Sequence, residues 1–133
     1  MGTHAVRAIA IAIEAPVKWV DNALSHHPIP GVTRNVRGVA RRLDETSVLA
    51  LALTRYLAVD LGVPLALGSR IAAKIVNEVG DDAALHRLSL SSGLTLEVPV
   101  AAILRRTRER LVDATEAVAH IKRGRPKARK NGA

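Results

Sequence analysis

The sequence predicts a mainly α-helical protein with small β-hairpins, and three observations point to that fold class. Apolar residues recur three or four positions apart over five stretches of the chain, as they do on the buried face of a helix. Around residues 88–98 the period changes to two, on both sides of a Ser91-Ser92-Gly93 turn, which is typical of a hairpin. The 133 residues include no Phe, one Trp and one Tyr, so the core has to be aliphatic.

Two short helices joined by a tight turn are expected first, which is a helix-turn-helix. Thr3 is the expected N-cap of the first helix. The apolar face of this helix holds Val6, Ile9, Ala10 and Ile13. Pro16 suits the first position of the second helix, because its missing amide would be unpaired there anyway. The second helix is expected to bury Val17, Val20 and Leu24. Its outer residues are expected to be Lys18, Asp21, Asn22 and Ser25, of which Lys18, Asn22 and Ser25 are the candidate DNA contacts.

The second helix is followed by a segment rich in arginine. The prolines of Pro28-Ile29-Pro30-Gly31 end the helix by about His27. Gly38 suits the tip of a hairpin, a small wing. Its arginines, with no acid among them, are Arg34, Arg37, Arg41 and Arg42. A polar helix face beside such a wing fits DNA, with the helix in a major groove and the guanidiniums on phosphates. An ordinary amphipathic helix followed by a solvated basic loop is the alternative.

Two more helices complete the middle of the chain. Asp44 is the expected N-cap of a third helix that runs to about Val59. Its core stripe holds Leu49, Ala52, Leu53, Tyr56 and Leu57. Because Val48 and Leu51 are apolar off that stripe, we expect burial on more than one side, with a second subunit as a candidate cover. A fourth helix, from Pro64 to about Gly80, should bury Leu67, Ile71, Ile75 and Val79.

The last helix is expected from about Pro99 to Ile121. Leu104, Leu111 and Val118 stand seven residues apart, with Thr107, Ala114 and Ile121 between them. This repeat favours a short coiled coil with a second copy of the chain, and a single helix laid on the domain is the alternative. A solvated face is expected of four arginines near its start, with DNA contact as the alternative: Arg105, Arg106, Arg108 and Arg110.

The charge of the chain indicates an anionic partner. The formal net charge is +8, and the segment 122–133 supplies six positive charges with no acid, so the remainder is nearly balanced. Nucleic acid is the expected partner. There is no Cys, which excludes disulfides and thiolate metal sites. Neither a membrane span nor a signal-peptide pattern is expected, and we expect a cytoplasmic protein.

In order and spacing, residues 5–79 resemble the DNA-binding domain of MerR-type transcription regulators. The family's second helix begins with a small or capping residue, an aliphatic and a basic residue, as in Pro16-Val17-Lys18. Its wing has a Gly before a basic strand ending in RL, as in Gly38 and Arg41-Arg42-Leu43. A short LG-containing turn joins its third and fourth helices, as in Asp60-Leu61-Gly62-Val63. The resemblance implies a winged helix-turn-helix fold and DNA binding.

The chain also departs from the family. Glu14 stands where the helix-turn-helix usually has Gly, and Asn22-Ala23 stand where aromatic residues usually end the second helix. MerR-type proteins commonly continue into a long dimerisation helix, and some carry a metal or drug sensor. Here a hairpin intervenes and Cys is absent. We therefore predict no metal, cofactor or drug sensing.

The C-terminal tail resembles an AT-hook, whose RGRP core lies extended in the minor groove of A/T-rich DNA. The residues that carry this resemblance are Lys122, Arg123, Gly124, Arg125, Pro126 and Lys127. Arg123 and Arg125 would enter the narrow, negative groove, and Gly124 would let the backbone approach closely. A generic basic tail is the alternative, and it too would add salt-dependent affinity.

No catalytic pattern occurs in the sequence. There is no nucleophile with a neighbouring base, no Gly-rich phosphate loop and no carboxylate pair with a partner, so we predict no enzyme. The adjacent His26-His27 do not face one another as metal ligands. The predicted organisation is a DNA-binding domain at 1–80, a hairpin and helix for dimerisation or partner binding at 81–121, and a basic tail at 122–133.

These observations predict a homodimeric transcription regulator that binds double-stranded DNA. The alternative is an antitoxin, in which the C-terminal hairpin and helix hold a protein toxin while the N-terminal part represses its own operon. It is suggested by the hairpin at 88–98, which DNA binding does not require. A third alternative is a nucleoid protein that binds DNA mainly through its tail.

Overall fold

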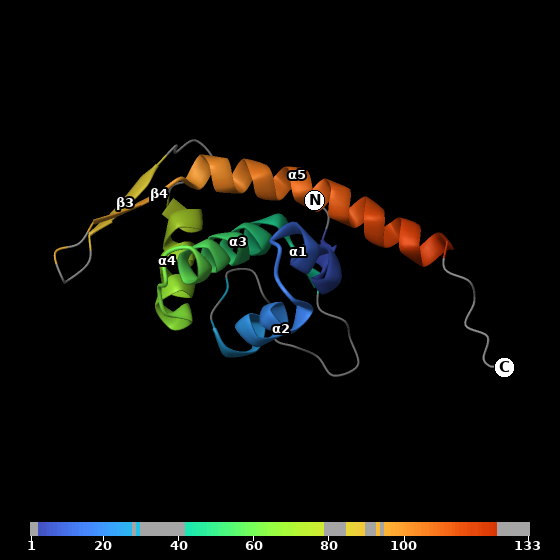
Figure 1. The fold of residues 1–133 in the computed structure, drawn as a ribbon, viewed down its shortest axis with the longest axis horizontal. Helices are drawn as coiled ribbons and strands as arrows, with labels where there is room; N and C mark the ends of the chain where they lie inside the picture. Colours follow the sequence, from blue (N-terminus) through green and yellow to red (C-terminus); the bar gives the residue numbers. More distant parts are fainter. Residues whose placement is uncertain are drawn as a thin grey trace.

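The computed structural model describes residues 3–27, 29, 42–78, 85–89, 93 and 95–124. The helices are α1 (Val6–Ala12), α2 (Val17–His26), α3 (Glu45–Val59), α4 (Leu65–Glu78) and α5 (Val100–Gly124). The strands are β1 (His4–Ala5), β2 (Arg42–Leu43), β3 (His86–Ser89) and β4 (Thr95–Val98). They form two antiparallel pairs, β1 with β2 and β3 with β4 (Figure 1). The predicted mainly helical class is confirmed.

Helix α3 lies at the centre of the core. Every residue from Ser47 to Thr54 is buried, so the predicted burial on more than one side is confirmed. The covers come from the same chain, because α4, α5 and β2 all pack against α3. The Thr54 hydroxyl, which is buried with the helix, donates to the Ala50 carbonyl at 2.7 Å and so has a partner. A second subunit is not needed to cover α3.

The ends of α3 follow the predicted local rules. Asp44 is the N-cap, and its carboxylate accepts from the Ser47 amide at 2.9 Å. At the other end the chain reverses at Gly62, whose φ of +69° is in the left-handed region that favours glycine. The Val63 amide then donates to the Leu57 carbonyl at 2.9 Å. Helix α4 begins directly afterwards and packs against α3.

The turn between α1 and α2 is a Schellman motif built without glycine. The Ala15 amide donates to the Ala10 carbonyl at 2.9 Å, and the Glu14 amide donates to the Ile11 carbonyl at 3.2 Å. These are the two bonds that end a helix through a left-handed residue. Here that residue is Glu14, with a φ of +56°. A side chain in this conformation costs roughly 1–2 kcal/mol, which explains why a glycine would suit the position.

Four sequence predictions in the helices are wrong. Thr3 does not cap α1, because Ala5 is the N-cap, with no side-chain bond. Pro16 is the N-cap of α2 and not its first residue. Val17 is 44% exposed, because it stands in the open first turn at the edge of the buried face. Leu67 is 37% exposed, because α4 turns a neighbouring face to the core.

The face of α4 that meets α3 is built on small residues. Gly68, Ser69 and Ala72 are buried, and Ile75 is buried with them as predicted. A Cβ atom at Gly68 would lie 3.6 Å from the Leu57 Cβ, so the two helices pack closely there. Val79, which was expected on the buried face, lies outside the described residues.

Helix α5 lies along the body and packs against α1 and α3 (Figure 1). The residues of its heptad seam that are buried inside this one chain are Leu104, Thr107, Leu111 and Ala114. Over these four residues the coiled-coil interpretation is therefore wrong, and the alternative of a helix laid on the domain is confirmed. The predicted hairpin before it is also confirmed, with His86 opposite Val98 and Ser89 opposite Thr95.

We expect Leu53→Ala to lower the free energy of unfolding by about 2–5 kcal/mol, because it leaves a cavity at a fully buried position of α3. Val59→Ala, in the last turn of the same helix, is the control, because Val59 is 58% exposed. Its effect should stay within about 0.5 kcal/mol. Urea unfolding followed by circular dichroism measures both. Equal losses in the two variants would contradict the central place of α3.

Candidate nucleic-acid interface

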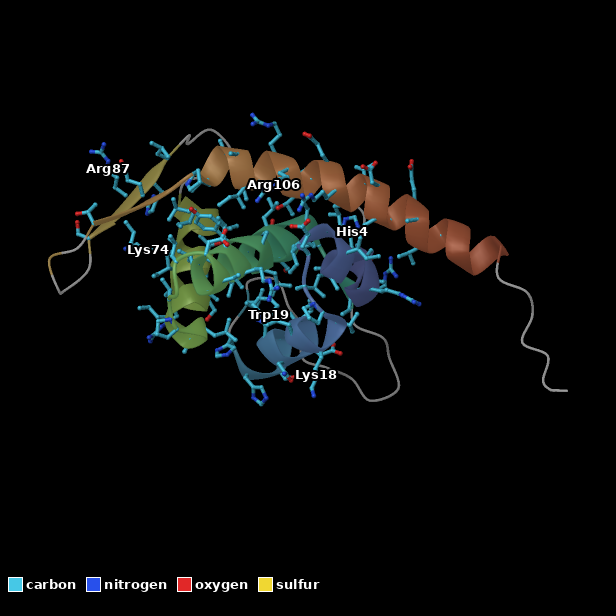
Figure 2. All side chains as sticks on the ribbon, viewed as in Figure 1. His4, Lys18, Trp19, Lys74, Arg87 and Arg106 are labelled. Carbon is cyan, nitrogen blue, oxygen red and sulfur yellow. The ribbon has the colours of Figure 1, made fainter. Side chains whose placement is uncertain are left out.

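Helix α2 presents a polar face away from the core. Lys18, Asn22 and Ser25 are all exposed and stand four and three residues apart, which places them on one side of the helix. The opposite side holds the buried Val20, Ala23 and Leu24. Figure 2 shows Lys18 pointing outward from α2, away from α3 and α5. The three predicted contact residues of this helix therefore share one accessible surface, which also includes the exposed Asp21.

Trp19 and Arg55 connect α2 to α3. The Arg55 guanidinium lies over the Trp19 ring, 5.0 Å from its centroid, which is a cation–π contact. The same guanidinium donates to the Glu14 carbonyl at 3.2 Å. One side chain of α3 thus contacts both the α1–α2 turn and the residue next to Lys18. This contact orients the polar face of α2 relative to the core.

Arg42 has a structural role in the fold. Its Nε donates to the Thr3 hydroxyl and its Nη2 donates to the Thr3 carbonyl, both at 2.9 Å. These bonds reinforce the pairing of β2 with β1, in which Ala5 is opposite Arg42. They also tie Arg42 to the residue directly before β1. The other arginines predicted there, Arg34, Arg37 and Arg41, lie outside the described residues.

The predicted AT-hook is only partly within the described chain. Helix α5 continues through Arg123 to Gly124, whereas we expected it to end at about Ile121 and the hook to be extended. Lys and Arg are good helix formers, which explains why the helix continues to this point. The rest of the hook, Arg125, Pro126 and Lys127, lies outside the described residues.

The arginine cluster of α5 is not simply a solvated face. Arg110 pairs with Glu14 at 2.9 Å, and Arg108 pairs with Glu45 at 3.4 Å. The Arg110 and Glu14 side chains are 38% and 68% exposed, so their pair contributes at most about 1 kcal/mol. Two of the four arginines are therefore engaged by carboxylates of the same chain, one of them in the α1–α2 turn.

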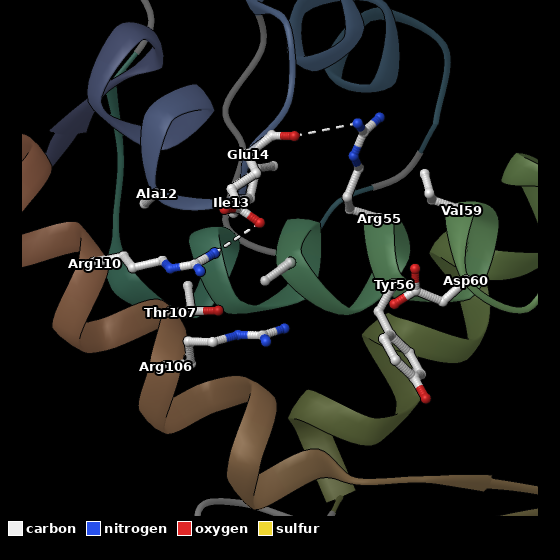
Figure 3. Close-up of a pocket in the computed structure, with 11 residues that line it drawn as sticks. Ala12, Ile13, Glu14, Arg55, Tyr56, Val59, Asp60, Arg106, Thr107 and Arg110 are labelled. Atoms are coloured by element: carbon white, nitrogen blue, oxygen red, sulfur yellow. Dashed lines mark hydrogen bonds and ion pairs between the residues drawn. The ribbon is translucent and has the colours of Figure 1, made fainter.

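A pocket of about 150 Å³ lies between the α1–α2 turn, α3 and α5 (Figure 3). Its charged lining residues are Glu14, Arg55, Asp60, Arg106 and Arg110. Sequence reasoning missed this pocket, because Glu14 and Arg55 are far apart in the chain and nothing in either segment indicates that they meet. The two available signals were the glutamate at a position that favours glycine and the arginine cluster of α5.

Other kinds of site are not found among the described residues. There, no group of three or more His, Cys, Asp or Glu side chains is placed to hold a metal ion. No described helix is both long and apolar enough to cross a membrane.

Comparison of the chain with protein-family models, curated proteins and solved structures gives no match.

We expect Glu14→Gly to be more stable than Glu14→Ala by about 1 kcal/mol. Both variants lose the ion pair with Arg110, so they differ in the Cβ atom that alanine keeps at a φ of +56°. Thermal and urea unfolding of the two variants side by side measures the difference. An alanine variant as stable as the glycine variant would show that the turn carries no strain.

Proposed function

We propose that this protein is a DNA-binding transcription regulator that inserts α2 into a major groove. The observation that carries the proposal is the shared outer face of Lys18, Asn22 and Ser25, opposite the buried side of the same helix. An amide side chain such as Asn22 can read a base edge, and a lysine such as Lys18 can contact a phosphate. The Schellman turn and the Arg55–Trp19 contact support this role, because they hold the helix in one orientation.

The basic segments on either side of the core complete the proposal. Arg34, Arg37, Arg41 and Arg42 would bind phosphates as a wing, with Arg42 also tied to Thr3. Arg123, Gly124, Arg125, Pro126 and Lys127 would enter a minor groove. The net charge of +8 supports an anionic partner of this kind. For the hook to bind extended, the last turn of α5 would have to unwind at Arg123 and Gly124.

A homodimer remains part of the proposal, but its interface differs from the one expected. From Leu104 to Ala114 the heptad seam of α5 is covered by the same chain, so two copies would have to meet on another surface. The antitoxin alternative also remains, because the β3–β4 hairpin projects from the body at the start of α5 (Figure 1). Co-purification with a protein encoded next to this chain would favour it.

We expect Lys18→Ala to weaken binding to double-stranded DNA and to reduce the dependence of log K on log salt by about one unit, because one phosphate contact is lost. Lys74→Ala is the matched control, since Lys74 is an exposed lysine on α4 (Figure 2). Fluorescence anisotropy with labelled DNA at several salt concentrations measures both. Equal slopes in the two variants would remove α2 from the interface.

A further inference from the structure

We propose that the pocket between the α1–α2 turn, α3 and α5 binds a small dianion, of the phosphate or dicarboxylate class, through Arg106 and Arg110. Figure 3 shows both side chains reaching from α5 toward α3, whose Arg55 and Tyr56 also line the pocket. Arg106 and Arg110 stand four residues apart, so they lie on one face of their helix. The planar fork of a single guanidinium matches two oxygens of a phosphate or carboxylate, so the two arginines together suit a dianion.

The present partners of these arginines leave room for an anion. Among the residues that the structure describes, Arg106 has no hydrogen-bond or ion-pair partner, although it lines the pocket. Within the described part of the chain, the partner of Arg110 is Glu14, whose side chain is 68% exposed and can move into water. A dianion would use the unpaired Arg106 and would compete with the Glu14 carboxylate for Arg110.

The size and charge of the pocket limit the ligand. A volume of about 150 Å³ is enough for a molecule the size of benzene or phosphate. Three arginines and two carboxylates, those of Glu14 and Asp60, line the pocket. The net charge of the lining becomes more positive when the Glu14 side chain moves out into water. A small anion is therefore favoured over a cation or an uncharged molecule.

Binding at this pocket would affect α2 through the contacts that Glu14 and Arg55 make. Glu14 binds Arg110 with its side chain and Arg55 with its carbonyl, and Arg55 lies over Trp19. Releasing the Glu14 side chain removes the tie between α5 and the left-handed residue of the turn. The Arg55–Trp19 contact then changes beside Lys18. The effect on DNA rests on the proposed function, whereas the anion site stands without it.

Trp19 provides the test, because it is the single Trp of the chain. Sodium phosphate and sodium succinate are titrated separately into the full chain at constant ionic strength, with Trp19 emission as the readout. We expect a saturable change with at least one of them. Saturation with phosphate alone assigns a tetrahedral anion, and saturation with succinate alone assigns a dicarboxylate. A change with neither, or one that sodium chloride reproduces, overturns the proposal.

Three variants make the test specific. Arg106→Gln should weaken the apparent affinity about tenfold, the effect of losing one charged hydrogen bond. Glu14→Gln should strengthen it, because the competing carboxylate is gone. Arg87→Gln, at an exposed ion pair on the distant hairpin, should leave it unchanged (Figure 2). Unchanged affinity in Arg106→Gln would overturn the site. Failure of the full chain to bind DNA would refute the proposed function, but it would not change the conclusion that the titration gives about the anion site.

Discussion

The burial of α3 on every side over two turns constrains the rest of the chain. With no Phe in the sequence, the core depends on many aliphatic side chains, each contributing about 1.5–3 kcal/mol when fully buried. Helices α4 and α5 and strand β2 are needed to cover α3, and α1 packs against α5 in turn. Helix α2 packs against α1 with one side only, so its polar side remains open.

The α1–α2 turn links that core to the open helix. Its left-handed residue is a glutamate, and the conformation is maintained by hydrogen bonds within the turn and by arginines from α3 and α5. A glycine would take the same backbone conformation without strain, but it would have no side chain for Arg110. Glu14 therefore makes the turn less stable than glycine would, but it adds an ion pair between the turn and Arg110 of α5. That connection is the basis of the proposed anion response.

Local patterns in the sequence were sufficient for some elements and not for others. Asp44, the turn at Gly62 and the hairpin before α5 depend on nearby residues, and they were predicted correctly. The packing partner of the α5 seam was predicted incorrectly. A heptad repeat shows that one face of a helix is apolar, but it does not show whether a second copy or α1 and α3 of the same chain cover that face. The pocket was missed for a related reason. Arg55 and Glu14 are 41 residues apart, and only the folded chain brings them together.

The most direct test of the central claim is selection of bound sequences from random double-stranded DNA. The full chain and a chain ending at Ile121 would each be used at low and moderate salt. If α2 reads the bases, both should enrich the same short site, and the shorter chain should bind it more weakly. Enrichment of A/T-rich DNA by the full chain, with none by the shorter chain, would contradict this account. DNA binding would then belong to the tail alone.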